Sequence, residues 1–461
     1  MMGLRGRADP RLGAMRSDIA ESAWPPITDS RTAVLAALVH QLDRSQWLSC
    51  DEIASRQRVQ LTALLTYHAS HSLGFAARLT AAGVTTNDLC QPGGLVRIPA
   101  LSRIEVQGFA ANFDDKDLPV KHQPVTSANT SGSTGEPVRV WRTALNRLHW
   151  LALTVRYHLW AEHEIPARLA IIRANVKTFG PRADWGVPMG LLWNSGPALL
   201  IDIENDINRQ IDLLADFAPD SVIIYPTNLL SLLDTMEQRG ESLPTVRLWR
   251  TLGETVTADA RERISEGHAA LLSDCYSTEE LGYLAMQCPD QPDTYHIVNE
   301  TVLIELVDDE GQPVTHGTVG KVLVTDLHNL AAPMIRYAVG DHAVAGDPCV
   351  CGRGGPTLSR IMGRTRNMIV KPDGTRHWPL LGYKQYRDIA PIRQYQMIQH
   401  KLEQLEMRLV TERPLTDAEE AAMTTHLQAK LRHPFAVTYS YFDGRLPVGK
   451  NGKFEEFLCL L

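Results

Sequence analysis

The sequence predicts an α/β protein with more than one domain, and three observations support this. The 461-residue chain exceeds the size at which one hydrophobic core stops growing. From about residue 120 onward, short apolar runs alternate with helical patterns, which is typical of a domain with largely parallel strands. After about residue 363 the pattern changes to that of a small α+β module with its own core.

The first part of the chain is expected to be helical. Residues 1–20 are rich in Gly, Pro and Arg and are predicted to be a disordered tail. Helices are then expected at Ala33–Leu42 and Leu61–Leu79, because apolar residues recur there at spacings of three and four.

The middle of the chain contains the expected sheet. Leu169–Ile172 and Val222–Tyr225 read as buried strands, and Asn228–Glu237 as the helix after the second strand. The run IVNETVLIELV at residues 297–307 begins a β-rich stretch that is expected to end near residue 363.

The C-terminal module is expected to combine strands with one helix. Strands are predicted at Tyr395–Ile398, Leu405–Val410 and Val437–Tyr441. The helix between the last two should open at Thr416, because Glu419 three residues later completes a capping box. The predicted domains are therefore 21–363 and 364–461.

Composition and charge exclude several classes of protein. Hydrophobic residues make up 44% and charged residues 21%, as in ordinary globular proteins, and the formal charge of −7 gives no reason to expect nucleic acid or an anionic membrane as partner. No apolar run reaches the roughly 18 residues of a membrane span, and the N-terminus lacks the apolar segment of a secretory signal. A cytoplasmic location is expected. Seven cysteines in this length do not form a disulfide scaffold.

A loop rich in glycine and hydroxyl residues occupies 130–137, with the sequence TSGSTGEP. Its glycines allow close approach of the backbone to a ligand, and successive N–H groups in such turns bind anions. Its hydroxyl groups can donate to phosphate oxygens. The composition fits a polar surface loop equally well. A Walker P-loop is excluded because no Gly-Lys-Ser/Thr ending follows.

Four later segments carry polar residues that suit a nucleotide. They are Tyr276–Glu280 (YSTEE), Ile335–Asp341 (IRYAVGD), Gly363–Ile369 (GRTRNMI) and Leu446–Lys453 (LPVGKNGK). Taken singly, each has an ordinary explanation: a solvated Glu pair opening a helix, a β-turn Gly-Asp, or a solvated Lys near a chain end.

Together and in this order, the loop and the four segments resemble the motifs of the adenylate-forming superfamily of acyl-CoA synthetases, luciferases and peptide-synthetase adenylation domains. Segments such as Ile98–Leu101 and Cys349–Arg353 resemble the phenylacetate–CoA ligase subgroup. This resemblance implies a large N-terminal domain with mixed sheets and a β-rich subdomain, and a small mobile α+β C-terminal domain. Two departures are Val138 after the loop, where many members have Lys, and Arg366 at the hinge position, where Asp is usual.

The resemblance also implies the roles of individual residues. The residues expected to act on the reacting groups are Lys453, Glu280 and Thr134. Glu280 would hold Mg²⁺, with Glu279 as its rival. Those expected to bind ATP are Thr130, Ser131, Gly132, Ser133 and Gly135 at the phosphates, Gly253, Glu254, Tyr276 and Ser277 at the adenine, and Asp341 and Arg364 at the ribose.

Cys288, His296, Cys349 and Cys351 form two pairs of soft ligands. Three thiolates and one imidazole are a sound tetrahedral set for structural Zn²⁺, although the spacings are not those of a zinc finger. The alternative is two unrelated buried side chains and a surface cysteine pair.

The implied function is activation of a carboxylic acid with ATP and Mg²⁺ to an acyl-adenylate, followed by transfer to a thiol. Coenzyme A is the expected acceptor, and a carrier-protein thiol or an amine is the alternative. The acid is expected to be aromatic and to bind near Trp193–Gly196, Tyr225–Leu229 and Leu252–Glu254. A non-catalytic, nucleotide-binding member of the family is the alternative from another class. No nucleic acid or membrane partner is expected.

Overall fold

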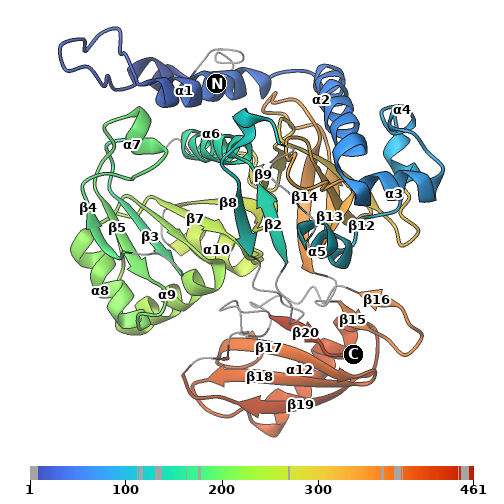
Figure 1. Ribbon diagram of the computed structural model, residues 1–461. Helices are drawn as coiled ribbons and strands as arrows, with labels where there is room; N and C mark the ends of the chain where they lie inside the picture. Colours follow the sequence, from blue (N-terminus) through green and yellow to red (C-terminus); the bar gives the residue numbers. More distant parts are fainter. Residues whose placement is uncertain are drawn as a thin grey trace. The chain divides into compact units, whose positions relative to one another are not determined.

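The structure of the chain is a computed structural model that describes residues 9–111, 113, 118–129, 138–161, 164–174, 178–267, 270–364, 368–377, 386, 388–444, 446–447 and 456–461. Contacts within the chain divide it into two compact units (Figure 1). The first unit comprises the described residues of Met1–Ile224, Leu243–Gly253 and Leu271–Ile361, and the second comprises those of Tyr225–Ser242, Glu254–Ala270 and Met362–Leu461.

The first unit combines helices with one large sheet. Its helices are η1 (Pro10–Ala14), α1 (Ser30–Ser45), α2 (Cys50–His71), α3 (Leu73–Ala82), α4 (Thr86–Leu89), η2 (Gly94–Arg97), α5 (Arg103–Ala111), η4 (Val120–His122), α6 (Ala144–Trp160), α7 (Met189–Leu192) and α8 (Ile207–Phe217). Its strands are β1 (Thr126–Asn129), β2 (Arg139–Arg142), β3 (Leu169–Arg173), β4 (Gly180–Arg182), β5 (Ala198–Asp202), β6 (Ser221–Ile224), β7 (Leu248–Leu252), β8 (Leu271–Thr278), β9 (Gly282–Gln287), β10 (Tyr295–Ile297), β11 (Val302–Val307), β12 (Val319–Asp326), β13 (Tyr337–Gly346) and β14 (Thr357–Arg364).

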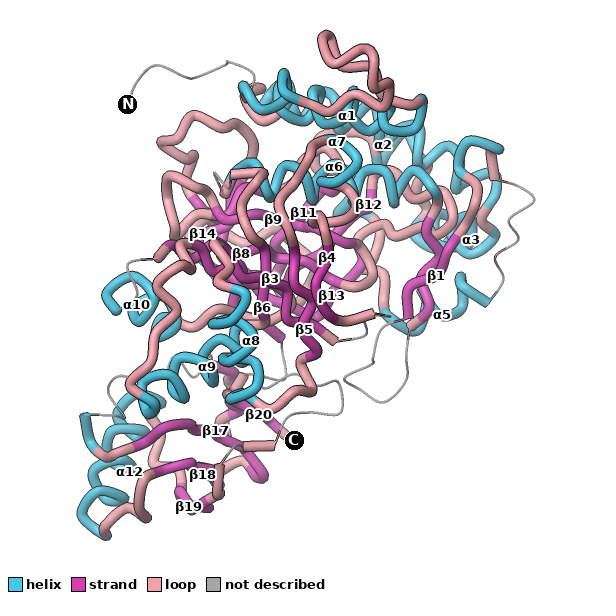
Figure 2. The backbone as a smooth tube through the Cα atoms, turned by 90° about the vertical axis from the view of Figure 1, so that its left-hand side faces the viewer, coloured by secondary structure: helices cyan, strands magenta, loops and turns pink. Residues whose placement is uncertain are grey.

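The large sheet has twelve strands in the order β11-β12-β13-β14-β10-β9-β8-β7-β6-β3-β5-β4. Strands β8, β7, β6, β3 and β5 pair in parallel, as the alternation of strands and helices predicts. The β-rich stretch from β8 through β13 adds antiparallel pairs on one side, and β4 adds one at the opposite edge. The expected mixed sheet is therefore confirmed. Figure 2 draws these strands together in magenta, with α1 and α6 beside one another.

Helix α6 lies over the sheet and supplies much of the core. It begins at Thr143, whose hydroxyl accepts the Asn146 N–H in a capping box. Its buried residues include Leu153, which joins one hydrophobic cluster with Leu35 of α1, Leu192 of α7 and Leu284 of β9. Burying apolar area of this extent is the main favourable contribution to folding of the unit.

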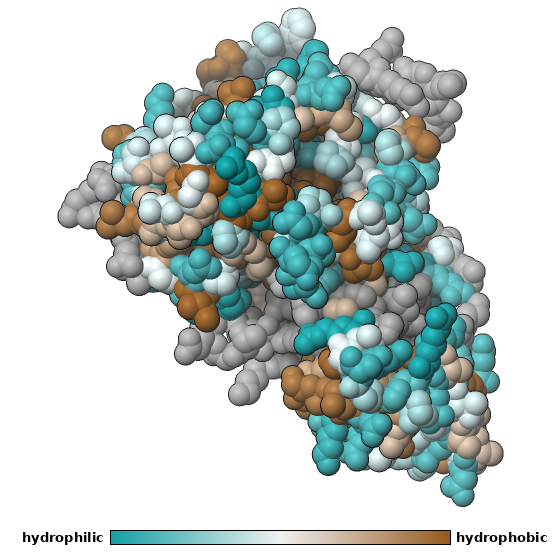
Figure 3. All heavy atoms as spheres, turned by 90° about the vertical axis from the view of Figure 1, so that its right-hand side faces the viewer, coloured by the Kyte–Doolittle hydropathy of each residue, from teal (hydrophilic) through white to brown (hydrophobic). Residues whose placement is uncertain are grey.

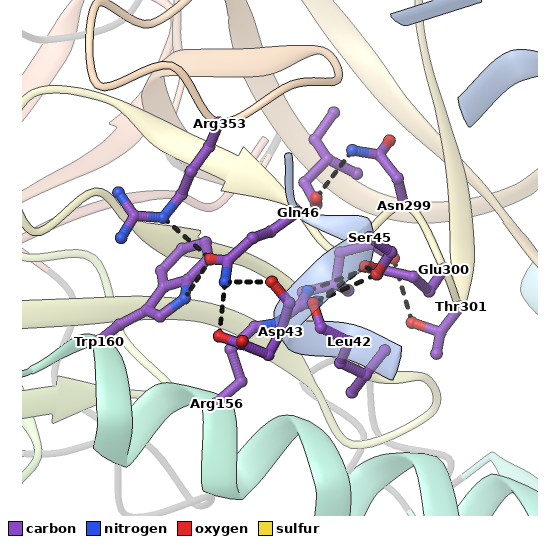
Figure 4. A network of polar contacts seen from close by, with 12 residues as sticks. Leu42, Asp43, Ser45, Gln46, Arg156, Trp160, Asn299, Glu300, Thr301 and Arg353 are labelled. Atoms are coloured by element: carbon purple, nitrogen blue, oxygen red, sulfur yellow. Dashed lines mark hydrogen bonds and ion pairs between the residues drawn. The ribbon is translucent and has the colours of Figure 1, made fainter. Parts of the chain in front are cut away.

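The end of helix α1 is joined to the rest of the unit by a polar network, which Figure 4 shows. The buried Arg156 of α6 forms an ion pair with Glu300 at 2.7 Å, and Ser45 at the end of α1 donates a hydrogen bond to the same carboxylate. Burial alone would raise the pKa of Glu300, but Arg156 and Ser45 outweigh burial and hold that pKa below its ordinary value. Gln46 adds bonds to Trp160 and Arg353.

Two expectations for this region are wrong. The helix predicted over Leu61–Leu79 is interrupted at Ser72, which ends α2 and caps α3 by accepting the Phe75 N–H. Serine favours such caps because its hydroxyl competes with the helical backbone bonds. The disorder predicted for residues 1–20 does not hold from Asp9 onward, since Leu12 is 4% exposed and the Trp193 indole donates to the Arg11 carbonyl at 2.9 Å.

The second unit contains two helices from the middle of the chain and the C-terminal module. Its elements are α9 (Pro226–Arg239), α10 (Ala258–Gly267), β15 (Ile369–Val370), β16 (Arg376–His377), β17 (Ile392–Lys401), β18 (Gln404–Thr411), α12 (Asp417–Leu431), β19 (Ala436–Tyr441) and β20 (Phe457–Cys459). Four strands pair in the order β19-β18-β17-β20. The capping box of Thr416 and Glu419 at the start of α12 is confirmed, as is the small C-terminal sheet domain.

The surface carries side chains of mixed polarity. On the face drawn in Figure 3, hydrophilic residues in teal are interspersed with hydrophobic ones in brown. Among the helices of the described residues, none combines the length and the apolar character that crossing a lipid bilayer requires.

Candidate active site

The predicted phosphate loop lies outside the described residues, but the strands on either side of it are described. β1 and β2 form an antiparallel pair in which Asn129 lies opposite Arg139. The loop therefore connects the facing ends of two paired strands. Thr130, Ser131, Gly132, Ser133, Thr134 and Gly135, together with Lys453 and the hinge residue Arg366, are all outside the described residues.

Two of the nucleotide segments meet directly in the first unit. The Tyr276 hydroxyl on β8 donates a hydrogen bond to the Asp341 carboxylate on β13 at 2.8 Å, across 65 residues of sequence. Tyr276 is buried, and Gly340 before the aspartate has φ of 86°, a conformation that favours glycine. The geometry thus holds the Asp341 carboxylate in a fixed orientation beside the end of β8.

The turn between β8 and β9 carries the two candidate carboxylates for Mg²⁺. Glu280 is the more buried, with 12% of its side chain exposed and an oxygen 3.7 Å from the Arg103 guanidinium, whereas Glu279 is exposed. Burial lowers the pKa of Arg142 just after the phosphate loop, and the charges of Glu279 and Glu280 act in the opposite direction. Carboxylate oxygens of this kind suit Mg²⁺, a hard cation, and the choice of Glu280 stays a prediction.

Gly253 and Glu254 fall in different units. Gly253 follows β7 with φ of 79°. Glu254 accepts hydrogen bonds from the Thr227 backbone at 3.0 Å and the Thr227 hydroxyl at 2.7 Å. Because Thr227 is in the first turn of α9, this carboxylate caps a helix whose N-cap residue, Tyr225, provides no side-chain cap. The structure thus gives Glu254 a helix-capping contact that the sequence analysis did not foresee.

The remaining nucleotide-binding candidates lie on strands. Ser277 is half-buried in β8, paired opposite Tyr283 of β9. Arg364 is the last residue of β14, and its side chain is outside the described part of the structure.

Arg336 forms buried contacts that its sequence motif does not indicate. The residue is 1% exposed. Its guanidinium pairs with Glu305 at 3.1 Å and donates to the carbonyls of Ile98 at 2.6 Å and Gly311 at 2.8 Å. The Leu101 N–H also donates a hydrogen bond to the Arg336 carbonyl at 2.8 Å. The segment Ile98–Leu101, which resembles the subgroup, and the segment Ile335–Asp341, which resembles a superfamily motif, are thereby joined.

The four candidate zinc ligands come together. The ligand atoms of Cys288, His296, Cys349 and Cys351 all lie within 4.8 Å of one another. Cys288 follows β9, His296 is on β10, and the other two precede β14, so the antiparallel pairing of β9, β10 and β14 brings them to one place.

The distances within this Cys/His cluster fit a tetrahedral metal. The Cys288 and Cys349 sulfurs are 3.7 Å apart, and the Cys351 sulfur is 3.4 Å from His296 Nε2. Zn–S bonds of about 2.3 Å and Zn–N bonds of about 2.0 Å at tetrahedral angles require S–S and S–N separations of about 3.8 and 3.5 Å. A disulfide is excluded because its sulfurs would be about 2.05 Å apart. The cluster therefore matches zinc in both chemistry and size.

Comparison with known proteins begins with family models, none of which matches the chain. Among curated proteins, a phenylacetate-coenzyme A ligase of Thermus thermophilus is 30% identical over 168 residues, but this match spans only 38% of that protein and 35% of this chain. The phenylacetate-coenzyme A ligase of Escherichia coli is 24% identical over 72% of this chain and 75% of its own length. That of Pseudomonas putida is 22% identical over 71% of this chain and 74% of its own length. The chain is therefore similar in sequence to phenylacetate-coenzyme A ligases over most of its length.

Solved structures of adenylate-forming proteins share its fold. A 2-hydroxyisobutyryl-CoA ligase in complex with 2-HIB-AMP has a TM-score of 0.74 and 17% identity, covering 90% of this chain and 91% of its own. The anthranilate CoA ligase AuaEII in complex with anthranoyl-AMP has a TM-score of 0.52 and 18% identity, with 68% and 63% covered. The predicted fold class is confirmed, and so is the predicted resemblance to phenylacetate-coenzyme A ligases.

In an adenylate-forming protein, the bond between Tyr276 and Asp341 should stabilise bound ATP. We expect Tyr276→Phe to weaken the apparent affinity for ATP about 10-fold, because a hydrogen bond to a charged group contributes about 1.5–3 kcal/mol. ATP titration by isothermal calorimetry measures this. The control is Tyr295→Phe, which removes a hydroxyl bonded at 2.7 Å to the buried Asp274 instead and should leave ATP affinity unchanged. Equal affinities for Tyr276→Phe and the native chain would contradict the assignment.

Proposed function

We propose that this chain activates a small carboxylic acid with ATP as an acyl-adenylate and transfers the acyl group to coenzyme A. The observation that carries the proposal is the contact between Tyr276 and Asp341, which unites two nucleotide-binding motifs of the superfamily in one place. Support comes from the fold shared with a 2-hydroxyisobutyryl-CoA ligase that was solved with its acyl-adenylate, and with the same ligase together with CoA.

In the first half-reaction, the substrate carboxylate attacks the α-phosphate of ATP and pyrophosphate leaves. Such transfers depend on positioning and charge neutralisation more than on covalent chemistry by the protein. The loop Thr130–Gly135 would hold the phosphates, Asp341 the ribose hydroxyls through charge-assisted hydrogen bonds, and Arg364 the ribose and phosphate. Lys453 would bridge the carboxylate and the α-phosphate.

A magnesium ion is part of this proposal. Glu280 would hold it, and the bound ion would neutralise phosphate charge. The half-buried carboxylate of Glu280 interacts electrostatically with Arg142 of β2, the strand that follows the predicted phosphate loop, and it has the donor chemistry that this ion needs.

In the second half-reaction, the thiol of coenzyme A displaces AMP from the acyl-adenylate. We propose that residues 364–461 form a small lid domain that turns about Arg366 relative to residues 21–363, withdrawing Lys453 and admitting the thiol. The alternative acceptors are a carrier-protein thiol and an amine, and the assay below compares them with coenzyme A. The proposed acid is aromatic, and the assay tests it against aliphatic and amino acids. A cytoplasmic location is also proposed.

Exchange of radiolabelled pyrophosphate into ATP is the decisive experiment. Pools of aromatic, aliphatic and amino acids are offered with Mg²⁺, and a positive pool is split to identify the acid. Coenzyme A, a phosphopantetheinylated carrier protein and hydroxylamine are then compared as acceptors. Acid-dependent exchange and an acyl-CoA product are the expected result. ATP binding without exchange for any acid would favour a non-catalytic nucleotide-binding protein instead.

We further propose that Cys288, His296, Cys349 and Cys351 bind one structural zinc ion. The cluster offers four protein ligands, which leaves no open position for a catalytic water. The Arg353 N–H, 3.3 Å from the Cys351 sulfur, would support the thiolate.

Zinc removal should destabilise the chain. Metal analysis is expected to find one zinc per chain, absent in Cys351→Ser and kept in Cys50→Ser, which alters an exposed cysteine outside the cluster. A metal at a hundred times its Kd stabilises the folded state by about 2.7 kcal/mol, which corresponds for 461 residues to a fall of roughly 3 °C in unfolding temperature on chelation. Equal metal content in both variants would refute the assignment.

A further inference from the structure

A cavity of about 530 Å³ lies in the first unit, and its walls come from helices α1, α2 and α6 and from the segments after β10 and β12. Helices α1 and α2 leave their short connection, residues 46–49, in different directions (Figure 1). Of the described residues that line the cavity, none is assigned above to ATP, Mg²⁺ or the acid. Its volume is within the range of about 300–1,000 Å³ that is typical of small-molecule sites. The cavity therefore has the size of a binding site to which the proposed function assigns no ligand.

The floor of this cavity is apolar. Leu42 of α1, Ile53 of α2 and Leu327 after β12 line it, and all three are buried. The half-buried Leu38 and Leu48 extend the apolar lining. Because moving apolar surface out of water is favourable, this floor favours a ligand with an apolar body.

Two stacked histidines form an uncharged part of the wall. The rings of His149 on α6 and His328 after β12 have centroids 4.2 Å apart. His149 Nδ1 lies 3.0 Å from the Leu145 carbonyl and His328 Nε2 lies 2.8 Å from the Glu300 carbonyl, so each ring donates its proton to the backbone. Burial lowers the pKa of both rings, that of His149 to about 4, and neither carries a charge at neutral pH.

Glu300 supplies the single carboxylate among the described residues that line the cavity, and its charge is already balanced. It forms the ion pair with Arg156 at 2.7 Å and accepts the hydrogen bond of the Ser45 hydroxyl (Figure 4). An anion that enters the cavity therefore does not meet an unpaired negative charge on these lining residues.

Two arginines provide positive charge at the opening of the cavity. Arg44, in the last turn of α1, and Arg56, on α2, line the cavity and are exposed. Neither takes part in an ion pair within the described part of the chain. Glu52, one turn before Arg56, interacts with it electrostatically, but its carboxylate is bonded to Ser49 in the capping box of α2. The two guanidinium groups are thus placed to attract and bind an anion.

We propose that this cavity binds an amphipathic organic anion, with its apolar body against Leu42, Ile53 and Leu327 and its anionic group at Arg44 and Arg56. The distribution of charge sets this orientation, because the unbalanced positive charge is at the opening and the floor and histidine wall are uncharged. Binding involves no covalent step. The site goes beyond the proposed function and does not depend on it.

The test uses decane-1-sulfonate as the probe, because a sulfonate carries the required charge and cannot form an acyl-adenylate. Its affinity for the native chain is compared with the affinities of decan-1-ol and decylammonium by isothermal titration calorimetry, without ATP and below micelle-forming concentrations. The sulfonate should bind roughly 10-fold more tightly than the alcohol, since two exposed charge pairs are gained. Decylammonium should bind most weakly. Added salt should reduce the preference for the sulfonate, because exposed charges are screened.

Matched variants locate the binding site. The double variant Arg44→Gln with Arg56→Gln should weaken sulfonate binding roughly 10-fold and leave the affinity for decan-1-ol unchanged. Leu48→Trp, which fills part of the apolar lining, should weaken the binding of both. The controls are Arg58→Gln and Val59→Trp, which alter exposed residues of α2 that do not line the cavity. Both controls should bind all three probes as the native chain does.

Two results would overturn the proposal. The first is that no probe binds, or that the alcohol or the cation binds at least as tightly as the sulfonate. The second is an unchanged sulfonate affinity in the double arginine variant; displacement by ATP would then place the probe in the nucleotide site. If Leu48→Trp does not fold, the double variant decides, because both of its arginines are exposed. Since the titration contains no ATP, failure of pyrophosphate exchange would count against the proposed function alone.

Discussion

Lys453→Ala is expected to slow acyl-adenylate formation by about 10²–10³-fold. The reason is that this lysine would stabilise the charge that develops between the carboxylate and the α-phosphate, and removing one such donor costs about 2.7–4 kcal/mol. The residue is outside the described part of the structure, so the prediction depends on the motif near the chain end. Acid-dependent pyrophosphate exchange measures the loss directly.

The second half-reaction should show whether Lys453→Ala impairs acyl-adenylate formation alone or the activity as a whole. When the acyl-adenylate is synthesised chemically and supplied with coenzyme A, Lys453→Ala should form acyl-CoA at close to the native rate. Lys450→Ala, which removes a neighbouring cation in the same segment, should retain most exchange activity. If Lys453→Ala lowers the rates of both half-reactions equally, this lysine does not withdraw between the two steps.

Arg336→Met is expected to destabilise the folded chain by about 3–5 kcal/mol, because removing one partner of a buried ion pair leaves the other uncompensated. Glu305 would remain with 14% of its side chain exposed, and the carbonyls of Ile98 and Gly311 would lose their donors. The φ of 55° at position 336 is equally unfavourable for Met and Arg, so backbone strain does not contribute to the difference. Urea unfolding measures the effect.

The destabilisation of Arg336→Met should depend on pH. Burial already raises the pKa of Glu305, against the opposing effect of Arg336, and loss of the arginine raises it further. A carboxyl whose pKa is raised on folding binds more protons when folded, so stability falls as pH rises through that range. The difference from the native chain should therefore shrink as the pH becomes mildly acidic. Arg336→Met with Glu305→Gln should recover part of the loss at neutral pH; a double variant no more stable than the single one would contradict the ion-pair explanation.

The sequence alone was a good guide where the signal is local or where a motif has a fixed order. The capping box of Thr416 and Glu419 is confirmed because N-cap and N3 residues interact within one helical turn. The strands near Leu169 and Val222 are confirmed because a central parallel strand needs a continuous apolar run. The break at Ser72 was missed because apolar spacing continues across it, and only the serine hydroxyl indicates a new cap.

Contacts between distant residues could not be derived from the sequence. Glu254 was assigned to the adenine site from its motif, and its bonds to Thr227 depend on the path of the intervening chain. The Cys/His cluster was identified because its ligand types are distinctive, whereas its closeness in space depends on the pairing of β9, β10 and β14.

The polar network at the end of α1 also constrains how the chain folds during synthesis. Gln46 bonds to Arg353, 307 residues later, and Ser45 bonds to Glu300, 255 residues later. At about 5–20 residues per second, the partner of Gln46 leaves the ribosome roughly 15–60 s after it. Helix α1, whose buried Leu35, Val39 and Leu42 pack with residues of α6 and later elements, must therefore wait with its apolar side exposed. This early segment is where the need for chaperones should be greatest.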